Sequence, residues 1–139
     1  MRIKTAKQLT KALDGLVREI FKLEKTPRKC FVCKRQFDLF HPKNNPYGLQ
    51  VGHYITRSVF PLRWDFKNLE WNCSVCNRIH EENILPFTKA MLDAYGEERI
   101  DYLNERWLAY KQSAKSMTSG QKRDLLDELQ MRIDILLKV

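Results

Sequence analysis

The chain has 139 residues, of which 43% are hydrophobic and 30% are charged, and its formal net charge is +8. This composition excludes a disordered chain, and no apolar run approaches the roughly 20 residues that cross a bilayer. Because the N-terminus lacks the apolar segment of a secretory signal, we expect a single-domain, non-membrane protein of the cytoplasm, where cysteines serve metals more often than disulfides.

The first 35 residues carry the whole of the net charge, with eleven Lys and Arg against three acidic residues. Residues 5–24 predict an amphipathic helix, because Thr5 and Gln8 have capping-box spacing and apolar residues recur at helical intervals until Pro27. A solvated lysine-rich helix would explain the charge, and so would a surface that follows the phosphates of a polyanion. The candidate DNA-binding residues are Lys4, Lys7, Lys11, Arg18, Lys22, Arg28, Lys29, Lys34 and Arg35.

The middle of the chain, residues 28–60, predicts loops and short strands at Phe31-Val32 and Leu49-Gln50-Val51, with a turn over 44–48. Helices are expected from near Cys76 to Glu82, over 86–95 between Pro86 and Gly96, over 97–112 and over 121–138. The expected division is a basic helix over 1–27, a core over 28–85 and C-terminal helices over 86–139, all within one compact domain.

Two Cys-x-x-Cys pairs, Cys30/Cys33 and Cys73/Cys76, are separated by 39 residues. Each two-residue gap lets both sulfur atoms face one ion, and four thiolates make the closed tetrahedral site typical of structural zinc. A redox dithiol needs one pair, usually after a strand of a βαβ unit, and is the weaker alternative, together with buried free cysteines. We expect Zn²⁺ here, contributing on the order of 10 kcal/mol to folding.

Between the pairs, His53 at the end of a short strand is followed by Asn68, and Asn77 comes directly after the last cysteine. This order resembles HNH nucleases, also called ββα-metal or His-Me finger nucleases. A neutral imidazole can take a proton from water, an Asn amide can orient the imidazole, and a cation at the helix start offsets charge on phosphate. Singly, these residues would more often be packing, turn or cap residues, and only their order favours nuclease chemistry.

A closer resemblance is carried by Gly52-His53-Tyr54-Ile55-Thr56-Arg57, Leu62-Arg63-Trp64-Asp65, Asn68, Cys73-Ser74-Val75-Cys76-Asn77-Arg78 and Asn83. These runs, with Tyr95-Gly96-Glu97-Glu98 and the basic helix before Cys30, resemble the phage NinG/Rap recombination endonuclease family. The similarity covers roughly residues 7–107 and leaves out the last 30. Endonuclease VII-type resolvases are similar in their two Cys-x-x-Cys pairs around a histidine and in the Asn after the last Cys.

The resemblance implies an α+β, mostly helical fold with a zinc-stapled ββα-metal (HNH) core between a basic N-terminal helix and C-terminal helices. It implies an endodeoxyribonuclease of the host cytosol that hydrolyses phosphodiester bonds in branched double-stranded DNA, such as Holliday junctions and D-loops. His53 would be the general base, Asn68 would orient it, and Asn77 would hold a catalytic Mg²⁺ or Mn²⁺. Arg57 suits a phosphate clamp, although a surface arginine would look the same.

One departure from the pattern is Gly52, because many HNH enzymes carry an Asp or His ligand directly before the catalytic histidine. We expect His80, three residues after Asn77 on the same helical face, to supply the missing ligand, with Glu81 a weaker candidate. Without such a ligand, the alternative is a non-catalytic zinc-ribbon DNA-binding or recombination accessory protein. A zinc-stabilised adaptor of other proteins would leave the basic N-terminus unexplained.

A homodimer is also expected, since cutting both strands of a nearly two-fold symmetric junction requires two active sites. The apolar stripes of the first and last helices are candidate interfaces, unless they pack within their own domain.

Overall fold

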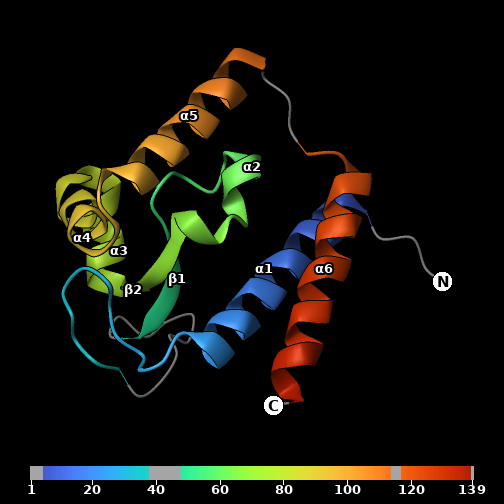
Figure 1. Cartoon of the computed structure of the whole chain (residues 1–139), viewed down its shortest axis with the longest axis horizontal. Helices are drawn as coiled ribbons and strands as arrows, with labels where there is room; N and C mark the ends of the chain where they lie inside the picture. Colours follow the sequence, from blue (N-terminus) through green and yellow to red (C-terminus); the bar gives the residue numbers. More distant parts are fainter. Residues whose placement is uncertain (1–4, 38–47, 114–116, 139) are drawn as a thin grey trace. The chain divides into compact units, whose positions relative to one another are not determined.

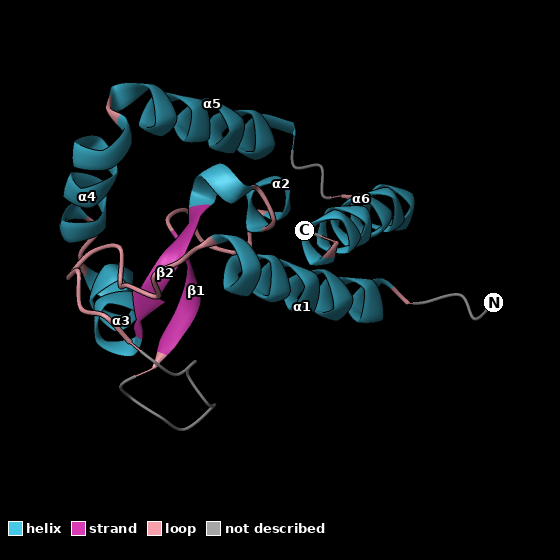
Figure 2. Cartoon of the chain, turned by 60° about the horizontal axis from the view of Figure 1, so that its bottom comes forward, coloured by secondary structure: helices cyan, strands magenta, loops and turns pink. Residues whose placement is uncertain are grey.

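The computed structural model describes residues 5–37, 48–113 and 117–138, which form a mostly helical α+β fold with one two-stranded sheet, as predicted (Figures 1 and 2). Contacts divide the chain into two compact units, one containing residues 1–26 and 116–139 and the other residues 27–115. This division differs from the predicted one, because the last helix groups with the first helix. None of the described helices is long and apolar enough to span a membrane.

The unit formed by the two chain ends consists of α1 (Ala6–Glu24) and α6 (Ser119–Leu137). The predicted capping box of α1 is present, since the Thr5 hydroxyl accepts from the Gln8 N–H at 3.2 Å and Gln8 Oε1 accepts from the Thr5 N–H at 2.9 Å. Thr118 and Gln121 form the same box at α6. This second Thr-x-x-Gln signal explains why α6 begins two residues before its predicted start.

In this unit α1 and α6 lie side by side and run in the same direction (Figure 1). The buried Lys122 donates a hydrogen bond to the Thr10 hydroxyl at 3.2 Å, and towards the other ends of the helices Arg132 pairs with Glu24. The buried face of α1 consists of Leu9, Leu13, Val17, Ile20 and Phe21, and that of α6 includes Leu129 and Ile133. Much of each predicted apolar stripe is therefore buried within the chain, and the predicted homodimer stays a prediction.

In the other unit, β1 (Leu49–His53) and β2 (Leu69–Cys73) pair antiparallel, and α3 (Ser74–Glu82) follows β2 directly. His53 ends β1 as predicted. The strand expected at Phe31-Val32 is wrong, because these residues lie in a turn, and residues 44–47 of the expected turn lie outside the described residues. The sequence analysis did not locate β2, whose polar residues Glu70 and Asn72 are buried.

Short helices connect the two strands, and two longer ones follow α3. The connection contains α2 (Phe60–Arg63) and the 3₁₀ helix η1 (Phe66–Asn68), neither of which was predicted. After α3 come α4 (Leu85–Tyr95) and α5 (Glu97–Ser113), separated as predicted by Gly96, which has a φ of 74°. The core of this unit consists of Tyr54, Val59, Leu62, Phe87, Met91 and Leu103.

A buried carboxylate connects β2 to α4 and α5. Glu70 is 6% exposed and accepts a hydrogen bond from the Tyr95 hydroxyl. Arg99 lies 3.7 Å from the same carboxylate, and its guanidinium covers the Tyr95 ring at 3.4 Å from the ring centroid. Burial, followed by the hydrogen bond to Glu70, raises the pKa of Tyr95 to about 12, so its hydroxyl stays a donor at neutral pH.

Replacing Tyr95 with Phe should lower the free energy of unfolding by about 1–3 kcal/mol, because the buried Glu70 carboxylate loses a donor. The matched control is Tyr110→Phe, which alters a tyrosine packed at the same core and should leave the midpoint of urea unfolding nearly unchanged. Equal midpoints for the two variants would contradict this role of Tyr95.

Candidate functional site

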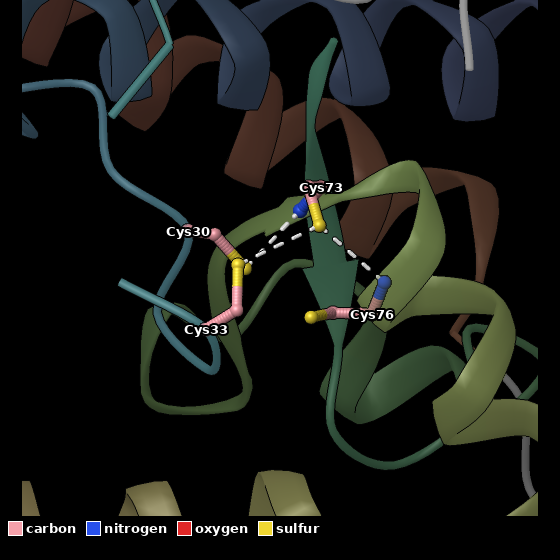
Figure 3. Close-up of side chains that lie close together, drawn as sticks. All are labelled: Cys30, Cys33, Cys73 and Cys76. Carbon is pink, nitrogen blue, oxygen red and sulfur yellow. Dashed lines mark hydrogen bonds between the residues drawn. The ribbon is translucent and has the colours of Figure 1, made fainter. Parts of the chain in front are cut away.

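Four cysteine sulfur atoms converge in the unit of residues 27–115 (Figure 3). The Sγ atoms of Cys30, Cys33, Cys73 and Cys76 all lie within 4.8 Å of one another. The Cys33 and Cys73 sulfurs are 3.9 Å apart, close to the roughly 3.8 Å that zinc–sulfur bonds of about 2.3 Å impose on a tetrahedron. The predicted clustering is confirmed, and this donor set and spacing fit a structural zinc ion.

Backbone hydrogen bonds hold each cysteine pair in place. The first pair lies in a turn in which the Lys34 N–H donates to the Cys30 carbonyl at 3.0 Å, and Lys34 has a φ of 67°. The Phe31 N–H donates to the Trp71 carbonyl at 2.8 Å and so fixes this turn to β2. The second pair begins where β2 ends, because Cys73 caps α3 and its sulfur accepts from the Cys76 N–H at 3.4 Å.

The electrostatics of the cluster favour a bound cation. Burial raises the pKa of Cys73 and of Cys76, and repulsion by Cys30 adds to both shifts. Burial also acts on Cys30, but surrounding backbone N–H groups outweigh it and lower the pKa of that thiol. Four thiolates in this volume repel one another, and a divalent cation removes the repulsion, so a metal ion would complete the site.

A second site is a cleft of about 800 Å³ between the end of β1 and α3. It brings together four of the predicted functional residues, His53, Arg57, Asn77 and His80, and it also includes Glu81. Its full lining is Gln50, Val51, His53, Tyr54, Thr56, Arg57, Asn77, His80, Glu81, Glu82 and Ile84. Histidine, arginine and amide side chains of the predicted set thus line one cleft.

His53 has a defined ring orientation in the cleft. Its Nε2 atom lies 2.9 Å from the Arg63 carbonyl oxygen. A carbonyl only accepts, so Nε2 carries the hydrogen in this contact, and in the neutral form of the ring the unprotonated nitrogen is Nδ1. The Arg63 backbone therefore fixes the direction of the imidazole ring.

Asn68 was predicted to orient His53, but its side-chain hydrogen bonds go to other residues. Asn68 is 1% exposed, and its side chain bonds the Ile55 N–H at 2.8 Å, the Ile55 carbonyl at 2.9 Å and the Leu62 carbonyl at 3.0 Å. The amide thus fixes the chain that follows β1, while the backbone of Arg63 orients the imidazole. A backbone partner cannot be read from residue types, which is why the sequence analysis missed it.

The structure gives His80 contacts that the sequence did not predict. Its Nε2 atom bonds the Tyr54 carbonyl at 2.7 Å, and its ring packs between Tyr54 and Phe87, with centroids 5.6 and 4.8 Å away. Its Nδ1 is buried without a hydrogen-bond partner among the described residues. The ring therefore supports the end of β1 through Nε2, and the role of His80 as a metal ligand stays a prediction. Because Nδ1 is buried, the more accessible ligand atoms of α3 at the cleft are the side-chain oxygens of Asn77, Glu81 and Glu82.

The predicted DNA-binding residues lie in both units. On α1, Lys7, Lys11 and Arg18 are exposed, whereas Lys22 is half-buried and lies 3.9 Å from Glu19. Of the residues around the first cysteine pair, Lys29, Lys34 and Arg35 are exposed and Arg28 is half-buried. The Lys34 ammonium donates to the Phe31 carbonyl at 2.6 Å and so also closes the cysteine turn. Lys4 lies outside the described residues.

Gly52 is required by packing. A Cβ atom at this position would lie 2.8 Å from Nδ2 and 2.9 Å from Cβ of Asn72. Asn72 is fully buried on β2, diagonally opposite Gly52 in the strand register. The absence of an acidic residue before His53 therefore has a steric cause, and sequence reasoning missed Asn72 because the residue showed no functional pattern.

Comparison with known proteins identifies relatives of the chain. A family model described as bacteriophage lambda NinG protein matches residues 1–132, which extends beyond the resemblance over 7–107. Protein ninG of Enterobacteria phage H19B is 30% identical over 83 residues, or 55% of this chain and 40% of that protein. Protein ninG of Salmonella phage P22 is 31% identical over 84 residues, or 55% and 41%.

Protein ninG of Escherichia phage lambda is 33% identical over 52 residues, which cover 37% of this chain and 26% of that protein. The chain therefore aligns with less than half the length of each of these relatives. No solved structure matches the chain.

Removing the metal should unfold the unit that contains the cysteines, because about 10 kcal/mol of folding free energy is expected from such a site. We expect about one zinc per purified chain, a large fall in helical circular dichroism on chelation, and recovery when zinc is restored. All four cysteines belong to the cluster, so a thiol reagent should react with them only after chelation. Protein that keeps its melting temperature without metal would contradict the site.

Proposed function

Because the chain belongs to the NinG family of bacteriophage proteins, we propose that it is a metal-dependent HNH-type endonuclease that cuts branched DNA such as Holliday junctions and D-loops. The observation that carries the proposal is the cleft in which His53, Arg57 and Asn77 meet. His53 and Arg57 come from the end of β1 and the chain that follows it, and Asn77 comes from α3. A base, a phosphate-binding cation and a metal ligand side by side are what phosphodiester hydrolysis requires.

His53 supplies the base in this proposal. Its Nδ1 takes a proton from water as the water attacks phosphorus, while the Nε2 hydrogen bond to the Arg63 carbonyl stabilises the imidazolium that forms. Arg57, exposed at the cleft, binds phosphate oxygens through its planar fork and keeps the scissile bond beside the base.

The catalytic cation would be held by Asn77 and Glu81, in place of the expected Asn77 and His80. Both line the cleft and are four residues apart on α3, so they share one helical face. Mg²⁺ commonly keeps several waters and takes one or two protein oxygens together with substrate phosphates, and Mn²⁺ accepts similar ligands. When bound, the ion would offset the negative charge that develops on phosphate.

The duplex arms of the junction are the proposed partner of the basic residues. Lys7, Lys11, Arg18 and Lys22 recur at steps of four, seven and four, which places them along one face of α1. Contacts of this kind with phosphate bind DNA without reading its sequence, and a homodimer would bring two clefts to one junction.

A second candidate function is a non-catalytic zinc-ribbon DNA-binding or recombination accessory protein. The observation that favours it is the packing of Gly52 on Asn72, which leaves no acidic ligand directly before His53.

The deciding experiment incubates a labelled four-way junction with the protein and Mg²⁺ or Mn²⁺. We expect His53→Ala to abolish cleavage, because the base is lost, and to leave junction binding within about twofold. Glu81→Gln should weaken cleavage mainly by raising the Mg²⁺ concentration required.

His53→Ala prepared by the same procedure also controls for a contaminating nuclease. Cleavage by this variant at the wild-type rate would refute the assignment of His53. Tight junction binding by a wild-type protein that does not cut with either metal would support the accessory function.

The charge on α1 makes a separate prediction. Replacing Lys7, Lys11 and Arg18 with Ala should weaken junction binding and reduce the slope of log K against log salt by about 0.9 for each phosphate that the variant no longer neutralises. Arg123→Ala, which removes an exposed arginine from α6, is the matched control. An unchanged salt slope in the triple variant would exclude α1 as a DNA-binding surface.

A further inference from the structure

The side chain of Asn72 is buried, and only one of its two polar atoms has a hydrogen-bond partner among the described residues. It lies on β2 directly before Cys73, and its exposed fraction is 0%. Its Oδ1 atom lies 3.6 Å from the Cys30 sulfur, whereas its Nδ2 has no hydrogen-bond partner among the described residues. Buried amide donors are nearly always paired, so this arrangement requires an explanation.

Metal binding would change the Cys30 sulfur from a hydrogen-bond donor to this amide into an acceptor. In the metal-free thiol, the S–H group can donate to Oδ1. A metal-bound cysteine is a thiolate, which has no hydrogen to donate and carries negative charge. The amide oxygen would then face an anion, while two N–H donors pointed elsewhere. Rotation of the amide by 180° about the Cβ–Cγ bond exchanges its nitrogen and oxygen at nearly constant shape.

Gly52 makes room for this amide on the neighbouring strand. A Cβ atom at residue 52, where glycine has only a hydrogen, would lie 2.8 Å from Nδ2 of Asn72. After the rotation, the amide oxygen occupies that place and faces the Cα–H bond of Gly52, a weak but favourable contact. Both ends of the rotated amide would then have a partner.

We propose that Asn72 donates a hydrogen bond from its side-chain amide to the metal-bound Cys30 thiolate and, through its contact with Gly52, connects the metal centre to the strand that carries His53. The Cys73 N–H, 3.4 Å from the same sulfur, is the second donor. Two donors spread the charge of the thiolate and fix its direction, which strengthens metal binding. The inference rests on the proposed metal centre and is independent of nuclease activity.

The first test uses the wild-type protein with ¹¹³Cd in place of zinc. An N–H···S–Cd hydrogen bond transmits a scalar coupling from the metal to the amide proton. We expect this coupling at the side-chain amide of Asn72, with the backbone N–H groups of Cys73 and Cys76 as internal references. Coupling at the references but not at Asn72 would overturn the inference, and a protein that binds no cadmium through its sulfurs would overturn the metal centre itself.

The second test uses Co²⁺-loaded variants. Asn72→Ala removes the donor, and Asn72→Asp places a second anion beside the thiolate. Both should shift the sulfur-to-cobalt charge-transfer band to lower energy and weaken zinc binding about 10- to 100-fold in competition with a chelator. Gly52→Ala, which displaces the amide by collision, should shift the band in the same direction.

Asn68→Ala is the matched control, because Asn68 is an equally buried asparagine whose hydrogen bonds go to the backbone at Ile55 and Leu62. It should lower stability and leave the cobalt band in its wild-type position. A band that stays unshifted in both Asn72 variants would refute the proposed hydrogen bond, since a purely structural role of Asn72 predicts the behaviour of Asn68.

Discussion

The fold of residues 27–115 depends on the convergence of four thiol groups that repel one another once ionised. Sulfur atoms this close are stable as thiolates only around a cation, so the arrangement is favourable with a metal ion and unfavourable without one. The sheet is too small to replace that contribution, because it has two strands of five residues each. The positions of the other elements around the sheet follow from this constraint.

Cys73 connects the cysteine cluster to the cleft. It is the last residue of β2 and the cap of α3, so fixing its sulfur fixes the angle at which the helix leaves the sheet. Asn77 and Glu81 lie on that helix, while His53 lies at the end of β1, where it pairs with Leu69 of β2. The two sides of the cleft are thus attached to one short β2 strand. Hydrogen bonds from Asn68 and His80 to the chain just after His53 complete the support.

Local signals in the sequence predicted local structure well. The capping box at Thr5, the stop at Gly96 and the clustering of the four cysteines are all present. The first two depend on residues close together in the chain, and the third was predicted from the regular spacing within each Cys-x-x-Cys pair. The partners of Asn68 and His80 were not predictable, because both side chains bind backbone carbonyl or amide groups, which every residue possesses. Asn72 and Glu70 were missed for a related reason, since a polar residue predicts exposure until its buried partner is known.

The parallel pairing of α1 with α6 has a consequence for the order of folding. Thr10 and Lys122, which bond between these helices, are 112 residues apart in the chain. On the ribosome, α1 emerges with its apolar face long before α6 exists, while all the residues of the unit that contains the cysteine cluster are synthesised in between. That unit can therefore fold first, and α1 meets its partner helix only after α6 has been synthesised. Until then, the nascent chain presents a basic, amphipathic and unpaired helix, and this is the stage at which it is most exposed to aggregation and to chaperones.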